Sequence, residues 1–185
     1  MKVKFFKFLI IPLITVICFS LACEPDDICP ESTSTTPRLI IDFYDANNQE
    51  NLKNVFDLRI EGIGNTTYLD GKDLSGNEIA YDGASNFNNA LLPLKTDANT
   101  TQFVLIKEYE FVDDTTPPKG NRDTITINYS RELVYVSRAC GYKTIYKDVT
   151  LTIEPDDDNW MKSRQPLSDN QSVENEFETH FNVTH

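Results

Sequence analysis

The chain has 185 residues, of which 25% are charged and only 7 are Gly, so it is neither collagen-like nor low-complexity, and one modest domain is expected. Its 29 acidic and 17 basic side chains give a formal net charge of −12. Such an acidic chain is unsuited to nucleic acid, whose phosphates require clustered Lys and Arg.

Residues 1–22 have the layout of an export signal. Lys2, Lys4 and Lys7 precede an uncharged apolar run over 8–22, which is short for a bilayer span of about 20 residues. A permanent N-terminal membrane helix is the alternative. Removing residues 1–22 takes away three Lys and no acid, so the net charge changes from −12 to −15.

The sequence SLAC at residues 20–23 resembles a bacterial lipobox, in which a small residue precedes a Cys that is acylated, for example with palmitate, and becomes the new N-terminus. Lipoboxes usually carry Leu three positions before the Cys, where this chain has Ser20. The same Ser-x-Ala pattern also suits ordinary signal peptidase cleavage. The motif therefore predicts a lipid anchor on Cys23 without requiring it.

The number of cysteines favours that anchor. Cys18 leaves with the signal, and acylation of Cys23 leaves Cys29 and Cys140 as a pair. In an oxidising compartment we expect these two to form a disulfide, with two free thiols as the alternative. Closing a loop of this length stabilises the fold by roughly 4–5 kcal/mol in the chain-entropy model.

Three segments follow the signal. Residues 23–37 form an acidic tether rich in Pro, Ser and Thr, and residues 38–154 carry short apolar–polar alternations typical of strands, as in DTITINYS at 123–130. Gly141 lies between two such runs and predicts a hairpin bend, whereas residues 62–99 are harder to interpret. Residues 155–185 are expected to be an acidic tail with a final edge strand.

No helical period persists beyond residue 38, and turn residues separate the short strands. This pattern predicts an all-β domain, an antiparallel β-sandwich that is immunoglobulin-like or related, with roughly seven to nine strands.

The motifs ICPESTSTTPRL at 28–39 and VSRACGYK at 136–143 resemble those of an uncharacterised family of small Bacteroidota lipoproteins. The resemblance implies an exported all-β lipoprotein in which Cys29 and Cys140 are recurring positions, and it implies no activity. Glu24, Asp26 and Asp27 resemble the acidic signal that directs lipoproteins of that phylum to the outer membrane, although Pro25 interrupts it. Both the periplasmic face and the cell surface remain open.

The sequence carries no nucleophile elbow, phosphate loop or zinc motif, so we expect no catalytic site, metal site or cofactor. His180 and His185 lie close to the end of the sequence and are expected at a solvated edge. The acidic stretches 70–78 and 156–158 could offer oxygen ligands to Ca²⁺, but acidic turns are more often simply solvated.

One group of residues suggests a binding surface. Tyr135, Arg138, Tyr142 and Lys143 combine aromatic and basic side chains in an acidic chain. They either pair with acids across a sheet or form a patch for a protein or glycan partner, because exposed Tyr and Arg are favoured anchors.

These observations predict a non-catalytic lipoprotein, anchored in the outer membrane through acyl chains on Cys23, that acts as a partner-binding module of a cell-envelope complex. An outer-membrane protein is the expected partner. The alternatives are a glycan-binding surface lipoprotein, which the single Trp160 weakens, and a hydrolase, which needs two converging carboxylates.

Overall fold

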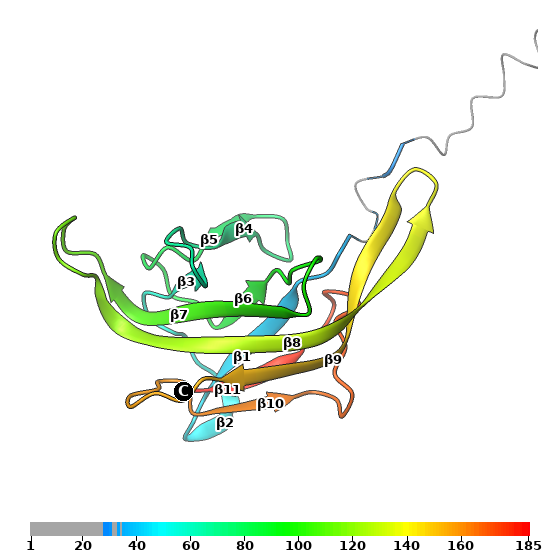
Figure 1. Ribbon diagram of the computed structural model, residues 1–185. Coiled ribbons are helices and arrows are strands. Elements are labelled where there is room, and N and C mark those ends of the chain that lie inside the picture. Colours follow the sequence, from blue (N-terminus) through cyan, green and yellow to red (C-terminus); the bar gives the residue numbers. More distant parts are fainter. Residues whose placement is uncertain (1–27, 31–32, 34) are drawn as a thin grey trace, which may run out of the picture. The chain divides into compact units, whose positions relative to one another are not determined.

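The computed structural model describes residues 28–30, 33 and 35–185, and every regular element in these ranges is a strand (Figure 1). The chain forms two compact units. Of the described residues, the smaller unit contains 28–30 and 33 with Tyr135–Tyr142, and the larger contains 35–134 with Lys143–His185. The strands are β1 (Leu39–Asp45), β2 (Asn48–Leu52), β3 (Arg59–Gly62), β4 (Asp70–Lys72), β5 (Glu78–Ala80), β6 (Asn89–Leu92), β7 (Thr100–Glu110), β8 (Lys119–Ser137), β9 (Gly141–Ile153), β10 (Ser163–Pro166) and β11 (Phe181–Thr184).

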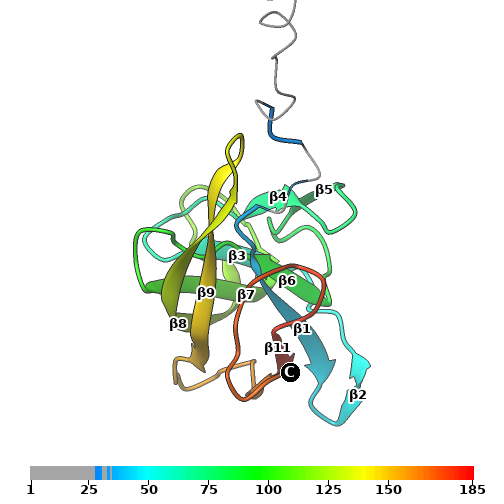
Figure 2. The ribbon, with the colours of Figure 1, turned by 90° about the vertical axis from the view of Figure 1, so that its right-hand side faces the viewer.

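The strands of the larger unit form two main sheets and one small hairpin. One sheet has the order β10-β11-β1-β2, with β6 also paired to β1, and the other has the order β3-β7-β8-β9. Strands β4 and β5 pair only with each other. In the ribbon of Figure 2, β1 lies between β2 and β11, in agreement with its pairing to both strands.

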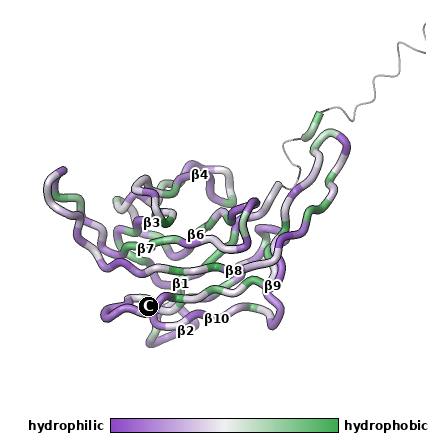
Figure 3. The backbone as a smooth tube through the Cα atoms, in the orientation of Figure 1, coloured by the Kyte–Doolittle hydropathy of each residue, from purple (hydrophilic) through white to green (hydrophobic). Residues whose placement is uncertain are grey.

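Both main sheets contribute to one core. Side chains of one parity along β7 and β8 are buried, and the register places Phe103 opposite Ile125 and Thr101 opposite Ile127. Phe43 of β1 and Phe181 of β11 belong to the same hydrophobic cluster as Phe103 and Ile125. The apolar stretches of β1 and β7 appear green in Figure 3. Two sheets that bury one face each against a shared core form a sandwich-like fold.

The all-β prediction is therefore confirmed, with eleven strands in the described part of the chain rather than seven to nine. The predicted bend at Gly141 is also confirmed, because β8 ends at Ser137 and β9 begins at Gly141. Antiparallel pairing holds in most of the fold. The exception is β1 and β11, which run parallel with Ile41 opposite Phe181 and Phe43 opposite Val183.

The prediction that residues 155–185 form a tail with an edge strand is wrong. Strand β11 pairs with β1 on one side and β10 on the other, so it is an interior strand. Phe181 and Val183 are buried in the core, and Trp160 and Met161 join them there. The acidic composition of this segment concealed these few apolar side chains, which are sufficient to fix it in the sandwich.

Candidate functional site

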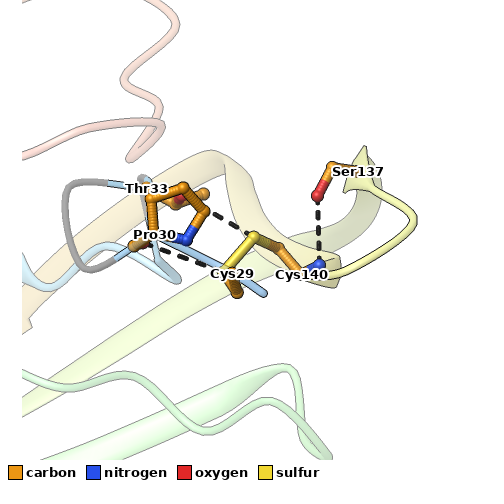
Figure 4. Close-up of a disulfide and its surroundings, with 5 residues drawn as sticks. All are labelled: Cys29, Pro30, Thr33, Ser137 and Cys140. Atoms are coloured by element: carbon orange, nitrogen blue, oxygen red, sulfur yellow. Dashed lines mark hydrogen bonds between the residues drawn. A yellow bond between two sulfur atoms is a disulfide. The ribbon is translucent and has the colours of Figure 1, made fainter. Parts of the chain in front are cut away.

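The predicted disulfide is present and lies in the smaller unit. Cys29 and Cys140 are joined with an S–S distance of 2.01 Å and a Cα–Cα distance of 4.9 Å (Figure 4). The hydroxyl oxygen of Thr33 lies 3.6 Å from the sulfur of Cys140. The bond thus fastens Cys29 and its described neighbours to the turn between β8 and β9.

That turn, with the strand ends beside it, forms a segment that we call the tip, residues Tyr135–Tyr142. The N–H of Cys140 donates a hydrogen bond of 3.0 Å to the hydroxyl oxygen of Ser137, which closes the turn (Figure 4). Gly141 follows with a φ of 70°, a left-handed conformation that Gly adopts without steric cost. The sequence thus places a tight, locally hydrogen-bonded turn beside the disulfide.

The tip presents two aromatic side chains to solvent. Tyr135 is 57% exposed and Tyr142 is 67% exposed. Their ring centroids are 5.4 Å apart with an interplanar angle of 67°, an edge-to-face contact of the kind that aromatic pairs prefer. Arg138 is exposed in the turn between them. The structure thus brings Tyr135 and Tyr142 of the predicted patch together and places Arg138 on the same segment.

Lys143, the fourth residue of the predicted patch, belongs to the larger unit. Its Nζ donates a hydrogen bond of 3.3 Å to the backbone carbonyl oxygen of Glu174. Nearby, Lys147 forms an ion pair with the Glu174 carboxylate. Both lysines therefore contact Glu174, which lies outside the strands of either sheet.

The histidine prediction is wrong, because His180 is 2% exposed and His185 is 7% exposed. Nδ1 of His180 accepts a hydrogen bond of 2.9 Å from the N–H of Ile40, while Nε2 of His185 lies 3.3 Å from the carbonyl oxygen of Lys53. Burial lowers the pKa of both imidazoles because it disfavours their charged form. Both rings serve the sandwich as packed, neutral side chains.

The two acidic stretches use carboxylates to close their own turns. Asp73 accepts a hydrogen bond from the side-chain amide of Asn77, which is the main reason that its pKa is lowered. The backbone N–H groups of Asn77 and Ser75 add hydrogen bonds of 2.8 Å that act in the same direction. Asp156 accepts one of 3.0 Å from the N–H of Asp158. Among the described residues, no group of three or more His, Cys, Asp or Glu is placed to hold a metal ion.

One buried carboxylate was missed by the sequence analysis. Asp123 is 0% exposed, and its two oxygens accept hydrogen bonds of 3.1 and 2.8 Å from the N–H groups of Trp160 and Met161. Burial raises its pKa, although both hydrogen bonds oppose that shift. The sequence did contain a signal for this burial, because Asp123 occupies the same alternate positions of DTITINYS as the side chains that face the core. Asp123 fastens the 160–161 segment to β8.

Cys23, the predicted signal and most of the tether lie outside the described residues. Within the described part of the chain, no helix has the length and apolar character needed to cross a membrane.

A sequence model of a family of unknown function, DUF6452, matches residues 64–185. The match includes the tip and Cys140 and begins after Cys29. Neither the curated proteins nor the solved structures include a match to the chain.

Proposed function

The chain belongs to the family of unknown function DUF6452, and we propose that it is a non-catalytic lipoprotein of the bacterial outer membrane that binds a protein partner through its tip. Acyl chains on Cys23 would attach it to the membrane. An outer-membrane protein of the cell envelope, in a Bacteroidota cell by the resemblance above, is the proposed partner.

The exposed pair Tyr135 and Tyr142 is the observation that carries this proposal. Large aromatic side chains bury much area at little cost in conformational entropy, and Tyr and Arg are enriched among the residues that dominate binding energy. Here the two rings already contact each other at 5.4 Å, and the disulfide at Cys140 holds the turn between them. A preformed aromatic pair loses little freedom when it binds.

Two observations support an anchor on Cys23. The sequence SLAC resembles a lipobox, and Cys29 and Cys140 form a disulfide with each other, so Cys23 is not needed as a disulfide partner for either. Stable attachment takes more than one acyl chain at about 0.8 kcal/mol per buried methylene. Lipoprotein processing provides such chains, whereas a body of net charge −15 would be repelled by anionic lipid.

The experiment is an affinity purification of the full chain from native membranes. We expect the double variant Tyr135→Ala/Tyr142→Ala to remain in the membrane fraction and to co-purify at least about tenfold less partner. Truncation of residues that dominate binding energy costs more than about 1.4 kcal/mol, which corresponds to a tenfold loss of affinity. Tyr68→Ala, another exposed Tyr, is the matched control.

Unchanged partner recovery by the double variant contradicts a role of the tip in binding. In the same fractionation Cys23→Ala should release the protein from the membrane, and continued tight attachment contradicts the lipid anchor.

Glycan binding is the second candidate, and exposed aromatic rings favour it because sugars stack on them. Retention of the wild-type protein on an envelope-polysaccharide gel, lost in the double Tyr variant, would favour this alternative over a protein partner.

A further inference from the structure

The disulfide shortens the covalent path between Cys23 and the tip. Cys29 follows Cys23 by six positions, and six residue steps span at most about 22 Å even when fully extended. Across the disulfide the Cα atoms of Cys29 and Cys140 are 4.9 Å apart, and Tyr142 follows two residues later. Without this bond the path would run through the sequence separation of 111 residues between the two cysteines.

We infer that the Cys29–Cys140 disulfide limits the height of the tip above the membrane, so that Tyr135 and Tyr142 dock on a membrane-embedded protein close to the membrane surface. This inference rests on the proposed lipid anchor at Cys23. The maximum reach of about 22 Å from Cys23 keeps the disulfide near the membrane, because this reach exceeds one headgroup layer of about 5–8 Å by only about 15 Å. A partner site far above the membrane would be out of reach.

The chemistry of the tip favours a protein surface over the lipid itself. The Tyr135 and Tyr142 rings pack against each other, which gives a shaped aromatic surface suited to an apolar pocket with hydrogen-bond acceptors for the two hydroxyl groups. Arg138 is the one charged residue in the sequence of the tip, whereas the chain beyond residue 22 carries −15. One cation does not offset the repulsion of such a body by anionic headgroups.

The test changes the path length on one side of the disulfide at a time. A Gly/Ser spacer of 20 residues is inserted between Asp27 and Ile28, which lengthens the path from Cys23 to the tip. The matched control carries the same spacer between Ser34 and Thr35, beyond the disulfide, where that path is unchanged. A photo-reactive amino acid replaces Ala139 in all proteins, and protein adducts are measured in native membranes.

We expect the first insertion to lower the adduct yield about tenfold, because effective concentration falls roughly as the −3/2 power of tether length. The control insertion should match the chain without a spacer. After solubilisation in detergent, where height above the membrane has no meaning, all three proteins should recover equal amounts of partner.

Equal adduct yields for the two insertions in membranes would overturn the inference and leave the proposed partner binding intact. A loss by the first insertion that persists in detergent would overturn it as well, because the spacer would then act on the tip itself. Adducts to lipid in place of protein would assign the tip to the bilayer surface and overturn the partner class. The absence of any adduct or recovered partner without a spacer would instead refute the proposed function.

Discussion

At the scale of single residues, the N–H of Ile40 depends on one side chain. It donates a hydrogen bond of 2.9 Å to Nδ1 of His180, in a part of the sandwich that excludes water. Replacement of His180 by Leu leaves this N–H unpaired and should lower the free energy of unfolding by about 1–3 kcal/mol. Replacement by Asn, whose amide oxygen can take the place of Nδ1, should retain most of the stability in urea unfolding at pH 7.5.

The pH dependence of these variants separates hydrogen bonding from titration. Because burial lowers the pKa of folded His180, the unfolded chain binds a proton first as the pH falls through about 6.5. The wild-type protein should therefore lose stability between pH 7.5 and 5.5. His180→Asn should lose less over the same interval, since only His185 still titrates there among the buried imidazoles. Equal losses in the two proteins would contradict this assignment.

The sequence could not place His180 or Asp123 because each side chain acts through a partner far away in the chain. Asp123 contacts residues 37 and 38 positions away, and His180 contacts Ile40 at a separation of 140. Polarity and nearness to the end of the sequence predicted exposure for His180, and tertiary hydrogen bonding outweighed both. For Cys29 and Cys140, the missing long-range information came from the expectation of an oxidising compartment and from the even number of cysteines left after Cys18 and Cys23 are set aside.

At the scale of elements, Gly83 lies in the connection between β5 and β6 and packs closely against Tyr109 of β7. A Cβ atom on Gly83 would lie 2.3 Å from Cδ1 and 2.9 Å from Cβ of Tyr109, and its φ is 92°. The guanidinium of Arg59 also lies over the Tyr109 ring, 4.7 Å from its centroid, so a shift of the ring would disturb that contact. Gly83→Ala should therefore cost about 2–5 kcal/mol, from the left-handed backbone and from crowding together.

Gly76 is the matched control for that substitution. Its φ is 87°, close to that of Gly83, but a Cβ atom there would meet nothing within 4 Å. Gly76→Ala should cost only the backbone term of about 1–2 kcal/mol. Chemical denaturation of both variants measures the difference, and equal costs would show that Tyr109 yields to the added methyl group.

The elements differ in how well the sequence predicts them, for a physical reason. Strands β7, β8 and β9 bury one face, so their alternation is visible in the sequence. Strands β4 and β5 are only three residues long and half-buried or exposed, so residues 62–99 show little period. The interior position of β11 depends on its parallel pairing with β1, and a local pattern carries no information about its partner strand.

At the scale of the whole molecule, net charge distinguishes two modes of membrane attachment, electrostatic adsorption and a lipid anchor. The chain beyond residue 22 has a net charge of −15, and anionic lipid favours basic segments by about 1 kcal/mol per Lys or Arg near the surface. Described cations such as Arg38, Arg59 and Lys147 also form ion pairs with carboxylates of their own chain. Adsorption by charge is therefore opposed by the body as a whole.

A protein that starts at residue 23 and carries Cys23→Ala should consequently not bind anionic vesicles. We expect co-sedimentation with such vesicles at low ionic strength to equal that with neutral vesicles, because the Debye length of about 30 Å at 0.01 M leaves the repulsion unscreened. The wild-type protein, isolated from membranes and reconstituted with the same lipids, is the positive control for the proposed acyl chains. Binding of the unacylated protein that disappears when salt is added would show that a basic surface, and not the acyl chains, attaches it. Retention by both kinds of vesicle would point to the exposed aromatic rings of the tip.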